Sequence, residues 1–225
     1  VSANSARKWH KWLMAIVGIQ FFIWSLTGLY MVLFNIHFIH GETLVTPANS
    51  TLTSTTINHE FSTIYQQYPE VKNLTLITVL NKTVYRFSSA GKLVAVDAAT
   101  GVELNKLSKT RAIAIAKQHL ATPLMVKSAK LLNKQAPSEL SARHLPVWRI
   151  EFDSLASPTL YISHTTGELV TKRHHYWRVF DWFWRFHIMD YDDGENVANW
   201  FLLLIALIAV LAAISGTILS YRRLI

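Results

Sequence analysis

The sequence predicts a membrane protein of the α+β class, in which two antiparallel transmembrane helices flank one domain of helices and antiparallel strands. The helices are predicted by two uncharged apolar runs, Trp12–Phe34 and Trp200–Leu219, because roughly 20 such residues cross a bilayer core. The domain is predicted by the residues between the runs, which change from a helical to an extended pattern twice in the same order.

Composition and charge limit the class of protein. Hydrophobic residues make up 51% of the chain and charged residues only 16%, which is low for a soluble domain. The formal net charge is +8, but the cations are scattered, which favours anionic membrane lipid over nucleic acid as a partner. The chain has no cysteine, so disulfides, thiolate catalysis, iron–sulfur clusters and cysteine zinc sites are excluded.

Basic residues next to the apolar runs predict the orientation. Arg7, Lys8 and Lys11 precede the first run, and Arg222-Arg223 follows the second. Such residues favour the cytoplasm, so both chain ends are predicted to be cytoplasmic and the intervening loop to lie outside. The first run is too long for a signal peptide and lacks a cleavage site, so it is predicted to be retained.

The chain divides into six predicted segments. Residues 1–38 form the cytoplasmic N-terminus and first span, and residues 39–56, rich in Thr, Ser, Pro and Asn, form a tether. Two similar repeats follow at 57–107 and 108–171. Residues 172–196 interleave cations and aromatics, which is typical of an interfacial helix, and residues 197–225 form the second span and a basic cytoplasmic end.

Each repeat is predicted to begin with a helix and to continue with antiparallel strands. The first helix follows the apolar spacing from Ile57 to Tyr68, and the second runs from Lys109 to Leu120 with Ser108 as its N-cap. The predicted strands are Leu74–Leu80, Thr83–Ser88 and Lys92–Asp97, then Met125–Leu132, Val147–Phe152 and Thr159–Ser163.

The two repeats can be aligned with each other. Val84–Phe87 corresponds to Val147–Ile150, and Val94–Glu103 corresponds to Leu160–Leu169. In both, a strand enters a polar turn that ends in glycine, and a second short extended piece leaves it. We therefore predict a duplicated unit.

Histidines are the predicted metal or haem ligands. His10 is expected at the cytoplasmic end of the helices, and His37, His40 and His187 at the outer end. His187 could share a b-type haem or a metal ion with His37 or His40, and His10 could meet its counterpart in a second chain. The alternative is that these histidines sit among lipid headgroups as ordinary interface residues.

Polar residues inside the first run predict helix packing. Gln20, Ser25 and Thr27 are expected to form hydrogen bonds with another helix, and Gly28 and Gly216 to allow close backbone approach. Neither run contains a charged residue, which argues against a proton relay or an ion pump. No serine-hydrolase or zinc-protease motif is present, so no hydrolase activity is predicted.

An acidic stretch precedes the second run. Its carboxylates could bind a hard cation, but they lack EF-hand spacing, and a solvated turn near the helix start, with Asn196 near its cap, is favoured. The acidic residues are Asp190, Asp192, Asp193 and Glu195.

Several stretches together resemble one family, the PepSY-associated transmembrane proteins. The resemblance covers nearly the whole chain. It is carried by Arg7–Trp12 leading to Ser25–Tyr30, by Ala213–Gly216 before Tyr221–Arg223, and by the strand-turn stretches Val96–Gly101 and His164–Glu168.

This resemblance implies a periplasmic α+β module held on helices of the bacterial inner membrane. PepSY modules are associated with protease regulation or inhibition, and longer membrane members with iron uptake and haem-containing reductases of iron–siderophore complexes. The resemblance therefore implies an accessory or binding protein in iron- or siderophore-linked or other membrane redox processes, with haem b as the implied cofactor. Its implied partner is another inner-membrane protein or a second copy. Any activity would be that of a haem-dependent reductase subunit, and a membrane-anchored periplasmic protease regulator is the alternative.

Overall fold

The computed structural model describes residues 3–46, 57–79, 82–104, 106–192 and 194–224. It divides into two compact units. The helical unit comprises Val1–Ile39 and Tyr176–Ile225, and the sheet unit comprises His40–His175.

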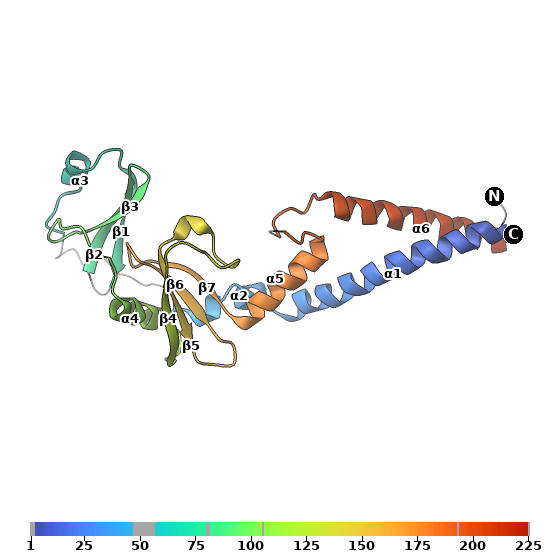
Figure 1. Ribbon diagram of the computed structural model, residues 1–225, viewed down its shortest axis with the longest axis horizontal. Coiled ribbons are helices and arrows are strands. Elements are labelled where there is room, and N and C mark those ends of the chain that lie inside the picture. The colour runs from blue at the N-terminus through green and yellow to red at the C-terminus, as the bar shows by residue number, and fades with distance from the viewer. Residues whose placement is uncertain (1–2, 47–56, 80–81, 105, 193, 225) are drawn as a thin grey trace. The chain divides into compact units, whose positions relative to one another are not determined.

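The helical unit contains two long apolar helices. They are α1 (Ala3–Leu33) and α6 (Trp200–Leu224), which lie side by side and run antiparallel (Figure 1). Within them, Arg7–Leu33 and Trp200–Tyr221 are long and apolar enough to cross a membrane. Many of their large apolar side chains are exposed, as expected of helices whose outer faces contact lipid.

Two further helices complete this unit. A short helix, α2 (Ile36–Ile39), follows α1, and the predicted aromatic helix is α5 (His175–Ile188). α5 packs against the second half of α1, where the Phe183 ring meets the Tyr30 ring edge-on at 5.0 Å. The Tyr30 hydroxyl donates to the Tyr176 carbonyl at 3.0 Å, which fixes the start of α5.

The sheet unit contains two antiparallel sheets, each beside one helix. The first sheet has the order β1-β2-β3 and the second the order β4-β5-β6-β7. The elements are α3 (Phe61–Gln67), β1 (Lys72–Val79), β2 (Lys82–Ser89), β3 (Lys92–Asp97), α4 (Lys109–His119), β4 (Val126–Leu132), β5 (Val147–Phe152), β6 (Thr159–Ser163) and β7 (Leu169–Arg173). Short 3-10 turns lie at Glu42–Leu44 and Ala142–His144.

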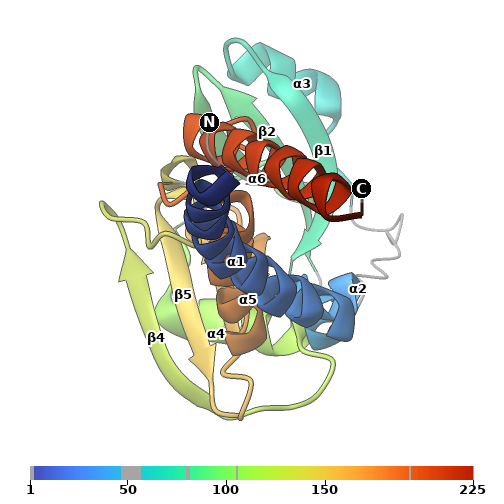
Figure 2. The same cartoon turned by 90° about the vertical axis from the view of Figure 1, so that its right-hand side faces the viewer.

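Apolar side chains pack each helix onto its sheet. In the first repeat, Ile64 of α3 is fully buried with Phe87 and Val96. In the second repeat, α4 covers one face of the sheet (Figure 2), and its Ile115 packs in a core with Ile150. The helix-and-strand domain predicted between the two apolar runs is therefore present.

Three predicted strands have the predicted bounds, and the other predicted helices and strands of the sheet unit begin or end one or more residues away. β3, β5 and β6 have the predicted bounds, and the N-cap at Ser108 is confirmed because its hydroxyl accepts from the Arg111 amide. Ala90 and Gly91 have φ of 47° and 74°, which makes the tight hairpin turn predicted there. Leu80, the predicted end of the first strand, lies outside the described residues.

Two segments differ from the prediction more than the others do. The first helix begins at Phe61, not at Ile57, because the amides of Asn58 and His59 both donate to the Ala98 carbonyl. The chain is therefore held extended there. Within the predicted tether, Val45 forms an isolated β-bridge with Leu120, next to the turn at Glu42–Leu44. Residues 47–56 of the tether lie outside the described residues.

Candidate functional site

Two histidines of the helical unit each lie against a hydroxyl group on a facing helix. His10 Nδ1 of α1 is 2.8 Å from Ser215 Oγ of α6. His187 Nδ1 of α5 is 2.9 Å from Thr27 Oγ1 of α1. α1 provides the imidazole in its contact with α6 and the hydroxyl in its contact with α5.

A glycine follows each hydroxyl residue, and each glycine faces an imidazole ring. A Cβ added to Gly216 would lie 2.9 Å from His10 Cε1, so a larger residue would displace the ring. A Cβ added to Gly28 would lie 3.8 Å from His187 Cε1, which is ordinary contact. The two glycines therefore make room for histidine rings and not for the close backbone approach that the sequence predicted.

Each hydroxyl also contacts a carbonyl oxygen of its own helix. Ser215 Oγ donates to the Ala212 carbonyl at 2.9 Å, and Thr27 Oγ1 donates to the Ile23 carbonyl at 2.8 Å. These are the side-chain-to-backbone bonds that Ser and Thr form inside helices. The backbone at His187 is held as well, since Trp24 Nε1 donates to its carbonyl at 2.7 Å.

The two histidines lie near opposite ends of α1. His10 and Thr27, the residue that His187 meets, are separated along α1 by roughly 25 Å at about 1.5 Å per residue. His10 and His187 therefore cannot bind the same ligand within one chain. This separation agrees with the prediction that they occupy different ends.

The other two predicted ligands are exposed. His37 lies in α2 next to Phe38, whose ring contacts Tyr176 in the first turn of α5, whereas His187 lies in its last turn. The structure therefore does not bring His37 and His187 together. His40 lies at an exposed turn of the sheet unit, and the described residues contain no group of three His, Cys, Asp or Glu side chains able to hold a metal ion.

The polar residues of α1 follow the helix contact only in part. Gln20 and Thr27 are buried, as predicted, whereas Ser25 is exposed. Gln20 Nε2 has no hydrogen-bond partner among the described residues. Only Thr27 thus joins its hydroxyl to another helix in the way the sequence predicted.

The acidic turn before α6 has a structural role. The buried Asp190 carboxylate accepts from the amides of Asp192 and Asn196. Asn199 caps α6, since its Oδ1 accepts from the Leu202 amide at 2.8 Å. Asp193 lies outside the described residues. The stretch is a turn before the helix, as predicted, but Asp190 is buried and not solvated, and the cap is Asn199 and not Asn196.

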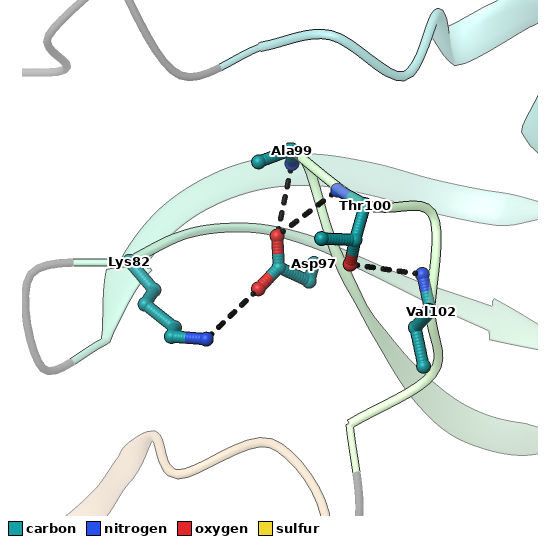
Figure 3. A network of polar contacts seen from close by, with 5 residues as sticks. All are labelled: Lys82, Asp97, Ala99, Thr100 and Val102. Carbon is teal, nitrogen blue, oxygen red and sulfur yellow. Dashed lines mark hydrogen bonds and ion pairs between the residues drawn. The ribbon is translucent and has the colours of Figure 1, made fainter.

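One polar cluster of the sheet unit stabilises the turn after β3 (Figure 3). The Asp97 carboxylate accepts from the amides of Ala99 and Thr100 and from the Lys82 ammonium. Burial alone would raise the pKa of Asp97, but these donors offset it, so the pKa lies below its ordinary value. The cluster uses its polar atoms internally, which indicates a structural role.

A second polar cluster lies on β5 and β6 of the second sheet. The fully buried Tyr161 hydroxyl donates to Glu139 and accepts from Arg149, and Arg149 also pairs with Glu151. Burial and the neighbouring Glu139 raise the pKa of Tyr161 well above its ordinary value, so it stays a neutral donor. These partners satisfy one another, and the cluster needs no ligand.

The chain was compared with known protein families, with curated proteins and with solved structures, and nothing matches it. A histidine that binds a metal generally hydrogen-bonds through its other ring nitrogen. His10 and His187 meet this condition through Nδ1, so Nε2 of each ring would be the atom that holds a metal ion or a haem iron.

The sequence contained a signal for the hydroxyl partners. A hydroxyl residue followed by glycine occurs in both apolar runs, as Thr27-Gly28 and Ser215-Gly216. Their pairing with His10 and His187 could not be derived, because it depends on which helix faces meet. Trp24 gave no signal beyond its apolar neighbours.

Proposed function

We propose that the chain is an accessory protein of the PepSY-associated type in the bacterial inner membrane, serving an iron- or siderophore-linked or other membrane redox process. In this proposal Nε2 of His10 and Nε2 of His187 would each hold a b-type haem, at separate positions along α1. The observation that supports it is the pair of contacts with Ser215 and Thr27. Bound haem would supply one-electron chemistry.

Each proposed haem needs a second ligand from outside the pair of residues described above. His10 and His187 lie at opposite ends of α1, so neither completes the other's site. We propose that the second ligand comes from a second copy of the chain or from another inner-membrane protein. The chain is then a subunit or helper, with no activity of its own.

We further propose that both chain ends are cytoplasmic and that the sheet unit is periplasmic. The contact between His10 and Ser215 puts the basic start of α1 near the end of α6, where Arg222-Arg223 follows. Basic residues on one end of a helix pair favour the cytoplasm. Trp9 and Trp12 are 71% and 65% exposed, which suits contact with membrane lipid at headgroup depth.

The absorption spectrum of the detergent-purified full chain tests the haem proposal. We expect a Soret band, reduced by His10→Ala and by His187→Ala and abolished by the double variant. His37→Ala and His40→Ala are the matched controls and should leave the band unchanged. A colourless protein that also fails to bind added ferric protoporphyrin IX would refute the haem proposal.

The alternative role, regulation of a periplasmic protease, predicts a different result. The purified protein would be colourless and would travel with a protease whose inhibition is lost when residues 58–170 are deleted. Reporter fusions within the sheet unit test the orientation separately, since a cytoplasmic signal there would contradict a periplasmic domain.

A further inference from the structure

The hydroxyl groups that contact His10 and His187 each have one proton to donate. Ser215 Oγ lies 2.9 Å from the Ala212 carbonyl oxygen and 2.8 Å from His10 Nδ1. Thr27 Oγ1 lies 2.8 Å from the Ile23 carbonyl oxygen and 2.9 Å from His187 Nδ1. In each case one oxygen is within hydrogen-bond distance of a carbonyl and of a ring nitrogen.

Only one arrangement of protons makes both contacts favourable. A carbonyl oxygen can only accept, so the hydroxyl must donate to it. The same hydroxyl oxygen then accepts from the ring, which requires a proton on Nδ1. In the reverse arrangement the hydroxyl would donate to Nδ1, and two oxygen lone pairs would face each other at the carbonyl without a proton between them.

We infer that Ser215 and Thr27 are positioning residues that hold His10 and His187 in the Nδ1–H tautomer, so that Nε2 of each ring carries the lone pair. A neutral histidine has one donor and one acceptor nitrogen, and its partner decides which is which. Water favours the opposite tautomer of free histidine. The two helix hydroxyls therefore select the less common form at both ends of the pair.

The glycine next to each hydroxyl residue also limits where the histidine ring can lie. Gly216 does this more tightly than Gly28. At Gly216 a Cβ would lie 2.9 Å from His10 Cε1, so glycine provides the space that lets this ring reach Ser215. At Gly28 the space is less tight, at 3.8 Å, but Trp24 fixes the backbone of His187. The ring orientation and the tautomer are thus set together at each site.

The consequence for ligand binding rests on the proposed function. A metal ion or haem iron binds the unprotonated nitrogen of a neutral histidine, which the hydroxyls set as Nε2. Loss of such a hydrogen-bonded partner weakens metal binding by about 10–100-fold in known sites. We expect a decrease of that size in affinity for ferric protoporphyrin IX in Thr27→Val and Ser215→Ala.

Nitrogen NMR of the full chain, labelled with 15N-histidine and free of haem, tests the tautomers directly. Spectra are recorded in detergent at about pH 9, where ordinary imidazole is neutral. His10→Gln and His187→Gln assign the two signals. We expect Nδ1 to be the protonated nitrogen of both rings, with Thr27→Val changing only the His187 pattern and Ser215→Ala only the His10 pattern.

Conservative variants separate a hydroxyl effect from a packing effect. Thr27→Ser and Ser215→Thr keep the hydroxyl and should retain the wild-type nitrogen patterns. Thr217→Val is the matched control, because the Thr217 hydroxyl donates to the Ala213 carbonyl in the same helix and is exposed. It should change neither histidine.

Two results would overturn the inference. One is a wild-type spectrum with the proton on Nε2 of His10 and His187, and the other is a set of hydroxyl-deleted variants with unchanged tautomers. Failure of the haem proposal is distinguishable, because a protein that binds no haem can still show the two Nδ1–H patterns. Conversely, haem binding with unchanged tautomers in Thr27→Val and Ser215→Ala would contradict the inference alone.

Discussion

In both repeats of the sheet unit, an aromatic side chain of a strand donates a hydrogen bond to the backbone just before the helix. The two repeats use different side chains for this contact. Tyr85 of β2 donates its hydroxyl to the carbonyl of His59, two residues before α3, at 2.8 Å. Trp148 of β5 donates its indole N–H to the carbonyl of Leu107, two residues before α4, also at 2.8 Å. The acceptor in both is backbone, so any aromatic side chain that carries a suitably placed donor can fill the role.

The turns after β3 and β6 show the same relationship. Gly101 and Gly167 have φ of 71° and 73°, and their amides donate to the carbonyls of Asp97 and Ser163. In the first turn a carboxylate accepts from the following amides, whereas in the second the Ser163 hydroxyl accepts from the Thr166 amide. The turn thus requires a side-chain acceptor and a glycine, and the charge paired with Lys82 is particular to the first repeat.

Core truncation in each repeat is the strongest way to break this equivalence. Phe87 and Ile150 occupy corresponding, fully buried positions. Phe87→Ala should lower the free energy of unfolding by about 3–5 kcal/mol and Ile150→Ala by about 2–5 kcal/mol, because each leaves a cavity. We expect hydrogen exchange, followed by mass spectrometry on the full chain, to accelerate in both repeats for either variant.

The shared response is expected because the repeats contact each other. Arg86 pairs with Glu168, and a Cβ on Gly167 would lie 2.9 Å from Val79 Cγ1. Leu155→Ala, at a fully exposed side chain, is the control and should change little. Faster exchange in only the substituted repeat would show that the two repeats unfold independently.

Alanine at the two turn glycines should separate backbone strain from crowding. Gly167→Ala should destabilise by about 3 kcal/mol, since the positive φ is strained and the new Cβ would meet Val79 and Ile115, which are stiff and packed. Gly101→Ala should cost less, because its Cβ would meet the His59 ring at 2.6 Å, and that partly buried ring can swing away. Chemical denaturation of each variant measures the ranking.

Gly91→Ala supplies the control for strain alone. Gly91 has a φ of 74° with nothing within 4 Å of an added Cβ, so about 1 kcal/mol is expected. If Gly101→Ala is less stable than Gly167→Ala, the His59 ring is harder to displace than the Val79 and Ile115 side chains are.

Acid should distinguish the two turns. The pKa of Asp97 is lowered in the folded protein, so its contribution to stability is complete above the ordinary aspartate pKa of about 3.9. That contribution is lost as the pH falls through the lower folded value. Asp97→Asn should therefore show a smaller loss of stability on acidification below about pH 4 than the wild type.

The corresponding substitution in the second repeat, at Ser163, leaves the Asp97 carboxylate in place. Ser163→Ala should be destabilised by about 1 kcal/mol at all pH values, because a neutral hydrogen bond is lost. It should retain the wild-type acid response of the first turn. Denaturation midpoints measured from about pH 2 to pH 7 compare the variants, and an unchanged acid response in Asp97→Asn would contradict this role of Asp97.

The sequence predicted local elements better than contacts between them. The strands around Val84–Phe87 and Val147–Ile150 follow from β-branched and aromatic residues bounded by turns, and the structure has them in place. The start of α3 was predicted too early because the Ala98 carbonyl, distant in sequence, accepts from the Asn58 and His59 amides. Apolar spacing carries no information about such a bond.

The same limit applies to the candidate site. His10 and His187 could be selected from the sequence as histidines near the ends of apolar runs, but so could His37 and His40. What separates the two pairs is the helix face that each presents to a hydroxyl on a neighbouring helix. That depends on the rotation and crossing of the helices, which an almost uniformly apolar sequence specifies poorly.

The smallest expected effect concerns the ion pair between the repeats. Arg86 and Arg149 occupy corresponding strand positions, but Arg86 pairs with Glu168 of the other repeat, whereas Arg149 pairs with Glu151 of its own sheet. The Glu168 side chain is 42% exposed, so Glu168→Gln should cost at most about 1 kcal/mol at low salt. The difference from wild type should disappear at about 1 M salt, where the screening length falls to about 3 Å.

Denaturation at both salt concentrations measures it, and the backbone bond from Ser163 N to the Glu168 carbonyl stays intact in the variant. A larger effect that salt does not change would mean that residue 168 acts through packing in its turn, and that the two sheets are joined mainly by the contact of Val79 with Gly167.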